Sequence, residues 1–193
     1  DIESILKETI LSGTRLSPTA RKYALQNMAV EDLLKLPLDQ EICRTILNRE
    51  NATAKELTLT LSELASLTNR NSLDLLLELL TDEQSQSSVH VFGLGELLTN
   101  YSSEELAAFN GQLQNMAING ATAEIKSLGY AAWIIADRSG DNAFLAASNN
   151  NQELRCFLES ISKIPDDLKT SLYEKVRPLV FSSTPNLTDS QKD

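Results

Sequence analysis

Hydroxyl residues followed by regularly spaced apolar residues mark helix starts along the chain. Thr53 with Glu56, and Ser102 with Glu105, fit the capping box, in which a hydroxyl and a carboxylate satisfy free amides at a helix start. Apolar residues then recur every three or four positions, first at Leu57, Leu61, Leu64 and Leu67, and later at Leu106, Phe109, Leu113 and Met116. This spacing predicts one amphipathic helix after each box.

Other segments show the same helical periodicity. Ser17 and Pro18 predict a third start, with a capping hydroxyl and proline at the first helical position. Further helices are expected over residues 2–11, 31–36, 39–47, 73–80, 89–98, 123–136, 153–161 and 167–179. The expected helices are joined by short connections that contain helix-breaking residues, namely Gly13, Pro37, 69–71, Gly120, Gly140, 149–151 and Pro165. The nearest approach to a strand is residues 89–92, which glycines follow.

A faint internal repeat accompanies these helices. The dipeptide Thr-Ala occurs at positions 19, 53 and 122, 34 and 69 positions apart, and each copy precedes a Lys or Arg. The residues Lys126, Gly129 and Trp133 also have the same spacing as Arg21, Ala24 and Met28. Repeats of this length built from helix pairs indicate solenoids. We therefore expect an all-α fold, an α-solenoid of stacked antiparallel helical hairpins of the HEAT/ARM type.

Domain organisation follows from the same pattern. Residues 1–182 are predicted to form a single HEAT-like helical repeat domain, because the helical pattern runs through them with only short connections. Residues 183–193 contain almost nothing to bury, so we expect a disordered tail or a linker there.

Composition and charge limit the partners. The net charge of −10 disfavours nucleic acid, whose phosphates an acidic surface repels. Hydrophobic residues make up 41% of the chain, but no apolar run approaches the roughly 20 residues of a membrane-spanning helix. We expect a soluble domain without membrane insertion.

Candidate catalytic groups have simpler structural interpretations. His90 is the single histidine, so it offers no histidine cluster for a metal or a triad. Cys43 and Cys156 are interpreted as buried free thiols, with a disulfide and the redox compartment left open. Acidic pairs at 82–83, 104–105 and 166–167 lie at predicted helix ends, where they cap helices or complement dipoles.

Glycine-containing segments also predict packing and turns. Residues 137–142 lack the terminal Glu of a calcium loop, so we interpret them as a helix-ending turn with Gly140 past the end. Gly93 and Gly95 indicate close helix packing rather than a phosphate loop. The helix over 123–136 is apolar nearly all round, so it is expected to be central, with Tyr130 and Trp133 in the core. We expect no catalytic, cofactor-binding or metal-ligating residues and no cofactor.

Two stretches of the second half carry small, aromatic and turn residues in a distinctive order. Residues 129–141 read GYAAWIIADRSGD, and residues 161–169 and 172–179 read ISKIPDDLK and LYEKVRPL. These stretches resemble the HEAT-like helical region of large planctomycete proteins that also carry cytochrome c and dehydrogenase or cupredoxin-like domains. The first half resembles that family only as generic hairpins.

The resemblance implies a context rather than an activity. It implies an exported or periplasmic bacterial protein with redox domains as neighbours. The heme attachment motif Cys-x-x-Cys-His is missing from this sequence, as are grouped copper ligands, so the redox functions of the family do not carry over.

Three functions are compatible with the sequence. The first is a non-catalytic protein–protein interaction or docking module, whose acidic surface suits a basic or heme-containing protein partner or neighbouring domain. The second is an inert structural spacer between redox domains. The third is an enzyme that uses carboxylates or Cys43 in a cleft between hairpins.

Overall fold

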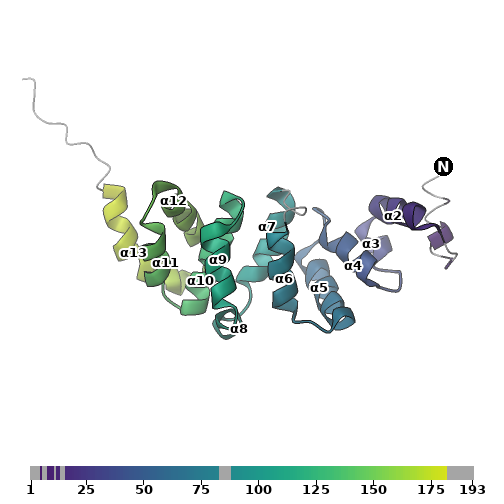
Figure 1. Ribbon diagram of the computed structural model, residues 1–193, viewed down its shortest axis with the longest axis horizontal. Coiled ribbons are helices and arrows are strands. Elements are labelled where there is room, and N and C mark those ends of the chain that lie inside the picture. Colours follow the sequence, from purple (N-terminus) through teal and green to yellow (C-terminus); the bar gives the residue numbers. More distant parts are fainter. Residues whose placement is uncertain (1–4, 6–7, 11, 14–15, 83–87, 182–193) are drawn as a thin grey trace, which may run out of the picture. The chain divides into compact units, whose positions relative to one another are not determined.

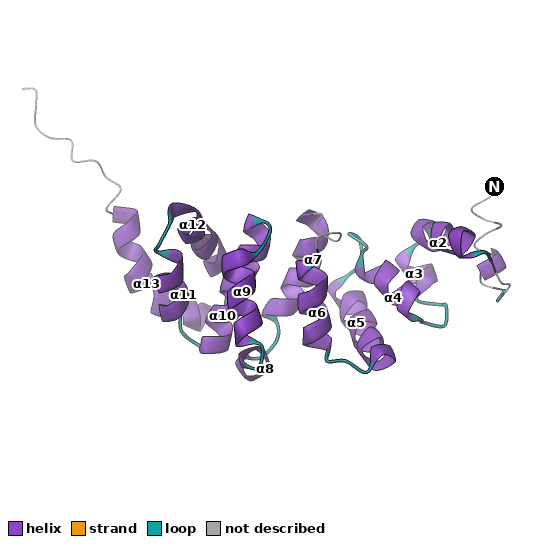
Figure 2. Cartoon of the chain, in the orientation of Figure 1, coloured by secondary structure: helices purple, strands orange, loops and turns teal. Residues whose placement is uncertain are grey.

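The computed structural model describes residues 5, 8–10, 12–13, 16–82 and 88–181, and this part of the chain consists of helices joined by turns and short loops. Those residues contain no strand, so the all-α prediction is confirmed (Figure 2). Residues 89–92, which came nearest to a strand pattern, lie in the helix α7 (Ser88–Thr99). The predicted tail over 183–193 lies outside the described residues.

The chain divides into two compact units. Figure 1 labels the helices that they contain. Unit 1 spans residues 1–101 and 120–125, and unit 2 spans residues 102–119 and 126–193. From residue 16 on, the described residues of unit 1 form α2 (Pro18–Asn27), α3 (Val30–Leu33), α4 (Gln40–Leu47), α5 (Ala54–Thr68), α6 (Ser72–Thr81) and α7. Those of unit 2 form α8 (Ser103–Ala107), α9 (Asn110–Asn119), α11 (Asp141–Ala147), α12 (Asn151–Ser160) and α13 (Asp166–Phe181), with a 3₁₀ turn at Ile161–Lys163.

One helix belongs to both units. The helix α10 (Ala123–Asp137) begins in unit 1 and runs into unit 2 after residue 125. The prediction of one continuous domain over residues 1–182 stays a prediction.

The predicted helix starts are confirmed. Ser17 caps α2, with Pro18 as its first residue, and the Ser17 hydroxyl accepts a hydrogen bond from the amide of Ala20. Both capping boxes are formed, by Thr53 with Glu56 at α5 and by Ser102 with Glu105 at α8. These interactions are local, so the sequence alone specifies them.

The core of unit 1 forms where α5 packs against α4, α6 and α7. Leu57, Leu61 and Leu64 are buried there, as the leucine spacing predicts. Leu67 was expected on the same buried face, but its side chain is 42% exposed in the last turn of α5. A second buried cluster joins α2, α3 and α4 through residues such as Leu25, Leu33 and Ile46.

The helix predicted after Ser102 is two helices, α8 and α9. The amide of Phe109 donates to the carbonyl of Leu106 at 2.9 Å, and the amide of Gln112 donates to that of Phe109, also at 2.9 Å. Bonds between residues three apart tighten the backbone into a 3₁₀-like turn between the two helices. Leu113 and Met116 are nevertheless buried, and Phe109 is half-buried.

The turn after α10 was predicted only in part. The helix ends at Asp137 as expected, but the left-handed residue is Arg138, with a φ of 51°. Gly140 has a φ of −92° and precedes the first residue of α11, a helix that the sequence did not predict. A Cβ atom at Gly140 would overlap the Leu172 side chain of α13. Close packing against Leu172, rather than a helix-ending conformation, therefore leaves little room for a side chain at Gly140.

The core of unit 2 surrounds α10. Residues 127–136 are all buried, which confirms that this helix is central and covered on all sides. Gly129 lies so close to α9 that a Cβ there would stand 2.7 Å from the Cα of Ala117. Tyr130 is fully buried, and Trp133 is 5% exposed. Tyr130 also contacts Phe157 of α12 edge to face.

Candidate functional site

A set of ion pairs lies on the surface of unit 1, and we call it the charged ladder (Arg21, Asp39, Glu41, Arg44, Arg70, Asp74 and Glu78). Arg21 of α2 donates to Asp39, the cap of α4, at 2.5 Å and to Glu41 at 2.8 Å. Arg44 of α4 approaches Glu78 of α6 at 3.8 Å. These pairs connect three helices, but their side chains are 34–49% exposed. Solvent screening makes the stabilising contribution of each pair small.

Arg70 completes the ladder beside α6. Its guanidinium donates to Asp74 at 2.5 Å and to Glu78 at 2.6 Å. The hydrogen bonds to Asp74 and then to Glu78 raise the pKa of Arg70, which keeps its charge at any ordinary pH.

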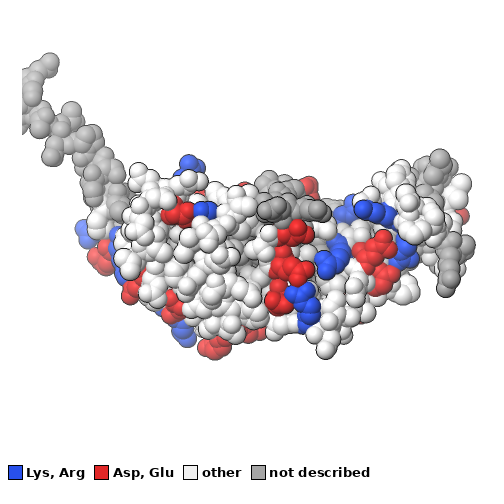
Figure 3. Space-filling model, viewed as in Figure 1, with Lys and Arg blue, Asp and Glu red and all other residues white. Residues whose placement is uncertain are grey.

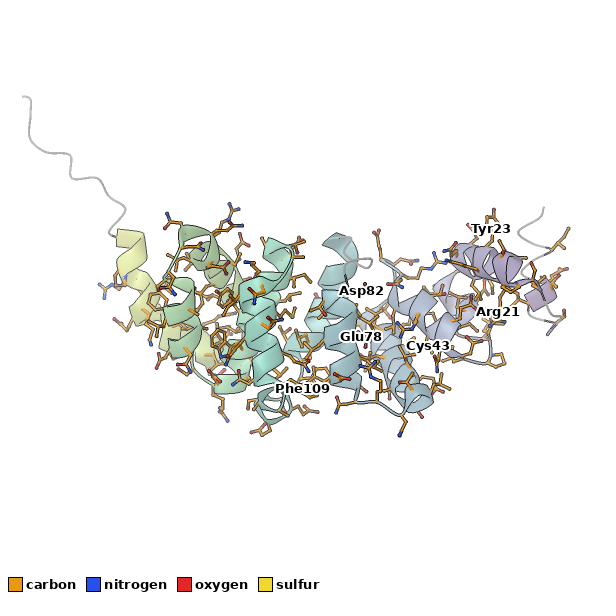
Figure 4. The ribbon with its side chains drawn as sticks, in the orientation of Figure 1. Arg21, Tyr23, Cys43, Glu78, Asp82 and Phe109 are labelled. Atoms are coloured by element: carbon orange, nitrogen blue, oxygen red, sulfur yellow. The ribbon has the colours of Figure 1, made fainter. Side chains whose placement is uncertain are left out.

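Three carboxylates line one side of α6, and we call them the acidic row (Asp74, Glu78 and Asp82). Their spacing of four residues places them on one helix face. Acidic side chains gather over α6 in Figure 3, and Figure 4 shows Glu78 and Asp82 on that helix. Asp82 is the residue after the last turn of α6, where the helix dipole disfavours a negative charge.

Unit 1 also carries most of the acidic excess of the protein. It contains sixteen of the 27 acidic residues but only nine of the 17 basic ones. Unit 1 therefore carries the more negative net charge of the two units.

Unit 2 contains a half-buried polar network around Glu153. Lys126 Nζ pairs with the Glu153 carboxylate and donates to the carbonyl of Ile118 at 2.7 Å. The Tyr130 hydroxyl donates to Glu153 Oε2 at 3.1 Å. Burial, and then the hydrogen bond to Glu153, raise the pKa of Tyr130. The network joins the end of α9 to the starts of α10 and α12.

A second polar cluster in unit 2 centres on Asp137. Its carboxylate accepts hydrogen bonds from Asn110 Nδ2 at 2.8 Å, Trp133 Nε1 at 2.9 Å and Asn142 Nδ2 at 3.1 Å. Three donors leave little hydrogen-bonding capacity for a ligand. Asp137 therefore ties α9, α10 and α11 together.

The two cysteines are buried and free, as expected. Burial raises the pKa of Cys43 to about 11, and the negative charges of Glu63 and Asp39 act in the same direction. Burial also raises the pKa of Cys156. A nucleophilic cysteine needs a lowered pKa, so both thiols have the opposite environment.

Two of the three acidic pairs lie at helix starts, where they complement the dipole as predicted, whereas Asp82 follows the C-terminal end of α6, where a negative charge does not complement it. Glu105 is in the first turn of α8, where hydrogen bonds from the hydroxyl and backbone amide of Ser102 lower its pKa. Asp166 begins α13, and its hydrogen bond from Lys169 lowers its pKa. Asp82 follows α6, whereas its neighbour Glu83 lies outside the described residues.

Gly93 has the packing role that was predicted for it. A Cβ at Gly93 would lie 3.2 Å from Leu57 Cδ1, so α7 can approach α5 closely there. The side chain of His90 lies outside the described residues. Within the described part of the chain, no three His, Cys, Asp or Glu side chains are placed to hold a metal ion. None of its helices combines the length and apolar character that crossing a membrane requires.

Sequence reasoning missed the partners of several side chains. Glu153, Asp137 and Arg49 each bond to a helix distant in sequence. Arg49 Nη2 donates to the carbonyls of Leu25 and Met28 at the end of α2, at 2.9 and 3.2 Å. A lone Arg before a helix start carries no local signal of this role.

Comparison of the chain with protein-family models, with curated proteins and with solved structures finds no match.

Proposed function

We propose that this protein is a non-catalytic docking module built as an α-solenoid of HEAT-like helical hairpins, and that its partner is a basic protein surface. The observation that carries the proposal is the acidic row on α6, within the more acidic of the two units. The resemblance to the helical regions of planctomycete redox proteins adds a specific candidate, a basic heme domain.

A repeated arrangement of helices supports the solenoid. Arg21 and Lys126 are each the fourth residue of their helix, α2 and α10. Each pairs with an acid at the start of the second helix that follows, Asp39 at α4 and Glu153 at α12. A short helix stands between the paired helices in both cases, α3 in one and α11 in the other.

The two arrangements also match in their packing residues. Ala24 and Gly129 occupy the same place relative to the basic residue, and both are buried. The third Thr-Ala copy is less regular, since Thr53 caps α5 whereas Thr19 lies inside α2, after its cap Ser17. A repeat of three-helix units is therefore better supported by α2–α4 and α10–α12 than by the dipeptide.

The acidic row suits a docking role because it combines exposure with negative charge. The side chains of Asp74 and Glu78 are 35% and 44% exposed. Complementary charge across an interface speeds encounter and fixes orientation, and its effect falls as salt rises. Arg44 pairs with Glu78, and Arg70 pairs with both Asp74 and Glu78, so these two side chains are held at the helix surface.

The test is the binding of an immobilised, purified chain to a basic c-type cytochrome, measured at low and physiological salt. We expect binding that weakens as salt increases, and we expect Asp82→Lys to weaken it further. A change of two charge units at a contact of this kind costs about 1 kcal/mol or more, a factor of at least five in Kd. The variant should keep its thermal stability, because a lysine suits the C-terminal end of a helix.

The matched control is Glu174→Lys, an exposed position on α13 in unit 2 that changes net charge by the same amount. It should reduce binding much less than Asp82→Lys. Equal effects of the two variants would mean that only net charge matters, with no docking surface on α6. No binding at either salt concentration would favour the inert spacer.

A further inference from the structure

Two oxidisable aromatic side chains lie together on α10 in unit 2. Tyr130 and Trp133 are three residues apart on one helix face, with ring centroids 6.3 Å apart and planes inclined by only 16°. Trp133 is the single tryptophan of the chain. Tyr130 is fully buried, whereas the Trp133 residue is 5% exposed. Trp133 is therefore the ring nearer to solvent.

Each ring donates its polar hydrogen to a carboxylate. Trp133 Nε1 donates to Asp137 Oδ2 at 2.9 Å, and the Tyr130 hydroxyl donates to Glu153 Oε2 at 3.1 Å. Buried Trp and Tyr side chains commonly find a hydrogen-bond partner, but the partner is often a neutral carbonyl. A carboxylate differs because it can stabilise positive charge on the ring and accept its proton.

We propose that Trp133 and Tyr130 form a relay that accepts one oxidising equivalent from an oxidised metal complex at the surface of unit 2 and stores it on Tyr130. In the first step, the Trp133 indole gives one electron to the complex, which is reduced, and the indole becomes a radical cation beside Asp137. In the second step, Tyr130 gives one electron to the indole, and its O–H bond breaks. The phenol proton moves to Glu153, leaving a neutral phenoxyl radical and a neutral carboxylic acid.

The final charge distribution favours the second step. A radical cation on fully buried Tyr130 would place a positive charge in the core beside a Glu153 carboxylate that Lys126 already neutralises, which is costly. Transfer of the proton to Glu153 keeps the ring neutral, and the added positive charge remains with the Lys126–Glu153 pair, whose side chains are 17% and 14% exposed. Burial also raises the pKa of Tyr130, so the phenol holds its proton until it is oxidised.

The aromatic rings next to Tyr130 do not compete for the oxidising equivalent. Phe157 packs edge to face against Tyr130 at 6.0 Å, and Phe144 packs against Phe157 at 5.6 Å. Phenylalanine is much harder to oxidise than tyrosine, so these rings do not carry the equivalent further. This inference rests on unit 2 alone and is independent of the proposed docking function.

Laser flash photolysis of the full chain tests the relay, with a ruthenium(III) tris-bipyridine complex generated by the flash as the oxidant. We expect the absorption of the indole radical to decay as that of the phenoxyl radical grows, with one shared rate. In Tyr130→Phe the indole radical should persist and the phenoxyl growth should be lost. In Glu153→Gln, which keeps an acceptor oxygen but is a far weaker base, the growth should be slowed or lost.

The matched control is Tyr173→Phe, which removes a tyrosine that is 58% exposed on α13. It should leave the coupled decay and growth unchanged. The relay is ruled out if the phenoxyl growth survives in Tyr130→Phe, or if the indole radical of the unchanged protein decays without it. Circular dichroism and thermal melting of each variant establish that unit 2 is folded during the measurement.

Discussion

Gly129 lies where α10 packs closely against the backbone of α9. The backbone of Ala117 occupies the space that a side chain at Gly129 would need. Backbone atoms cannot move aside as the end of a flexible side chain can, so the absence of a side chain is required here. By contrast, a Cβ at Gly111 of α9 would meet nothing within 4 Å.

The two glycines therefore predict opposite effects of the same substitution. Gly129→Ala is expected to lower the free energy of unfolding by about 3 kcal/mol, because the helices must separate. Gly111→Ala is expected to raise it by up to about 1 kcal/mol, because alanine is the better helix former. Urea unfolding followed by circular dichroism measures both, and equal stabilities of the two variants would contradict the close helix crossing.

Helix starts are the best-defined features at the scale of elements. At α8, the Glu105 carboxylate accepts hydrogen bonds from the amide and hydroxyl of Ser102, at 2.9 and 2.7 Å. These bonds lower the pKa of Glu105 in the folded protein. The cap therefore stabilises the fold above the ordinary pKa of Glu near 4.5, and this contribution is lost as the pH falls through the lowered pKa.

The titration of Glu105 tests the cap directly. NMR of the side-chain carboxyl should show a midpoint below that of an ordinary Glu, and Ser102→Ala should move the midpoint upward. Ser103→Ala is the control, because this neighbour is the first residue of α8 and does not cap it. An unchanged midpoint in Ser102→Ala would show that the box does not form in solution.

At the scale of the whole molecule, α10 connects the two units because it begins in one and continues in the other. Loss of unit 1 releases the first residues of a helix whose remaining length forms the core of unit 2. We therefore expect the units to unfold together.

The two buried thiols report on this coupling. Cys43 lies in unit 1 and Cys156 in unit 2, and burial raises the pKa of both. Both should resist alkylation at neutral pH in the native protein and react at the same urea concentration, as judged by mass spectrometry of the labelled peptides. Separate midpoints for the two cysteines would show that the units are independent domains.

The sequence by itself determined the all-α class and the main helix starts. The side chains of Ser17, Thr53 and Ser102 each accept a hydrogen bond from the backbone amide three residues later, so their capping role can be predicted from the local sequence. The apolar run around Tyr130 likewise predicted a central helix, because a helix without a polar face must be covered on all sides.

Only the tertiary structure decided the features that depend on distant residues. Gly140 was assigned to a helix end, yet its space is taken by Leu172 of a later helix. The break between α8 and α9 occurs within one continuous apolar pattern, so periodicity could not reveal it. Lys126 meets Glu153 and Asp137 meets Asn110, each 27 residues apart. Such contacts depend on how the helices pack against one another. That packing could not be predicted from local patterns in one sequence.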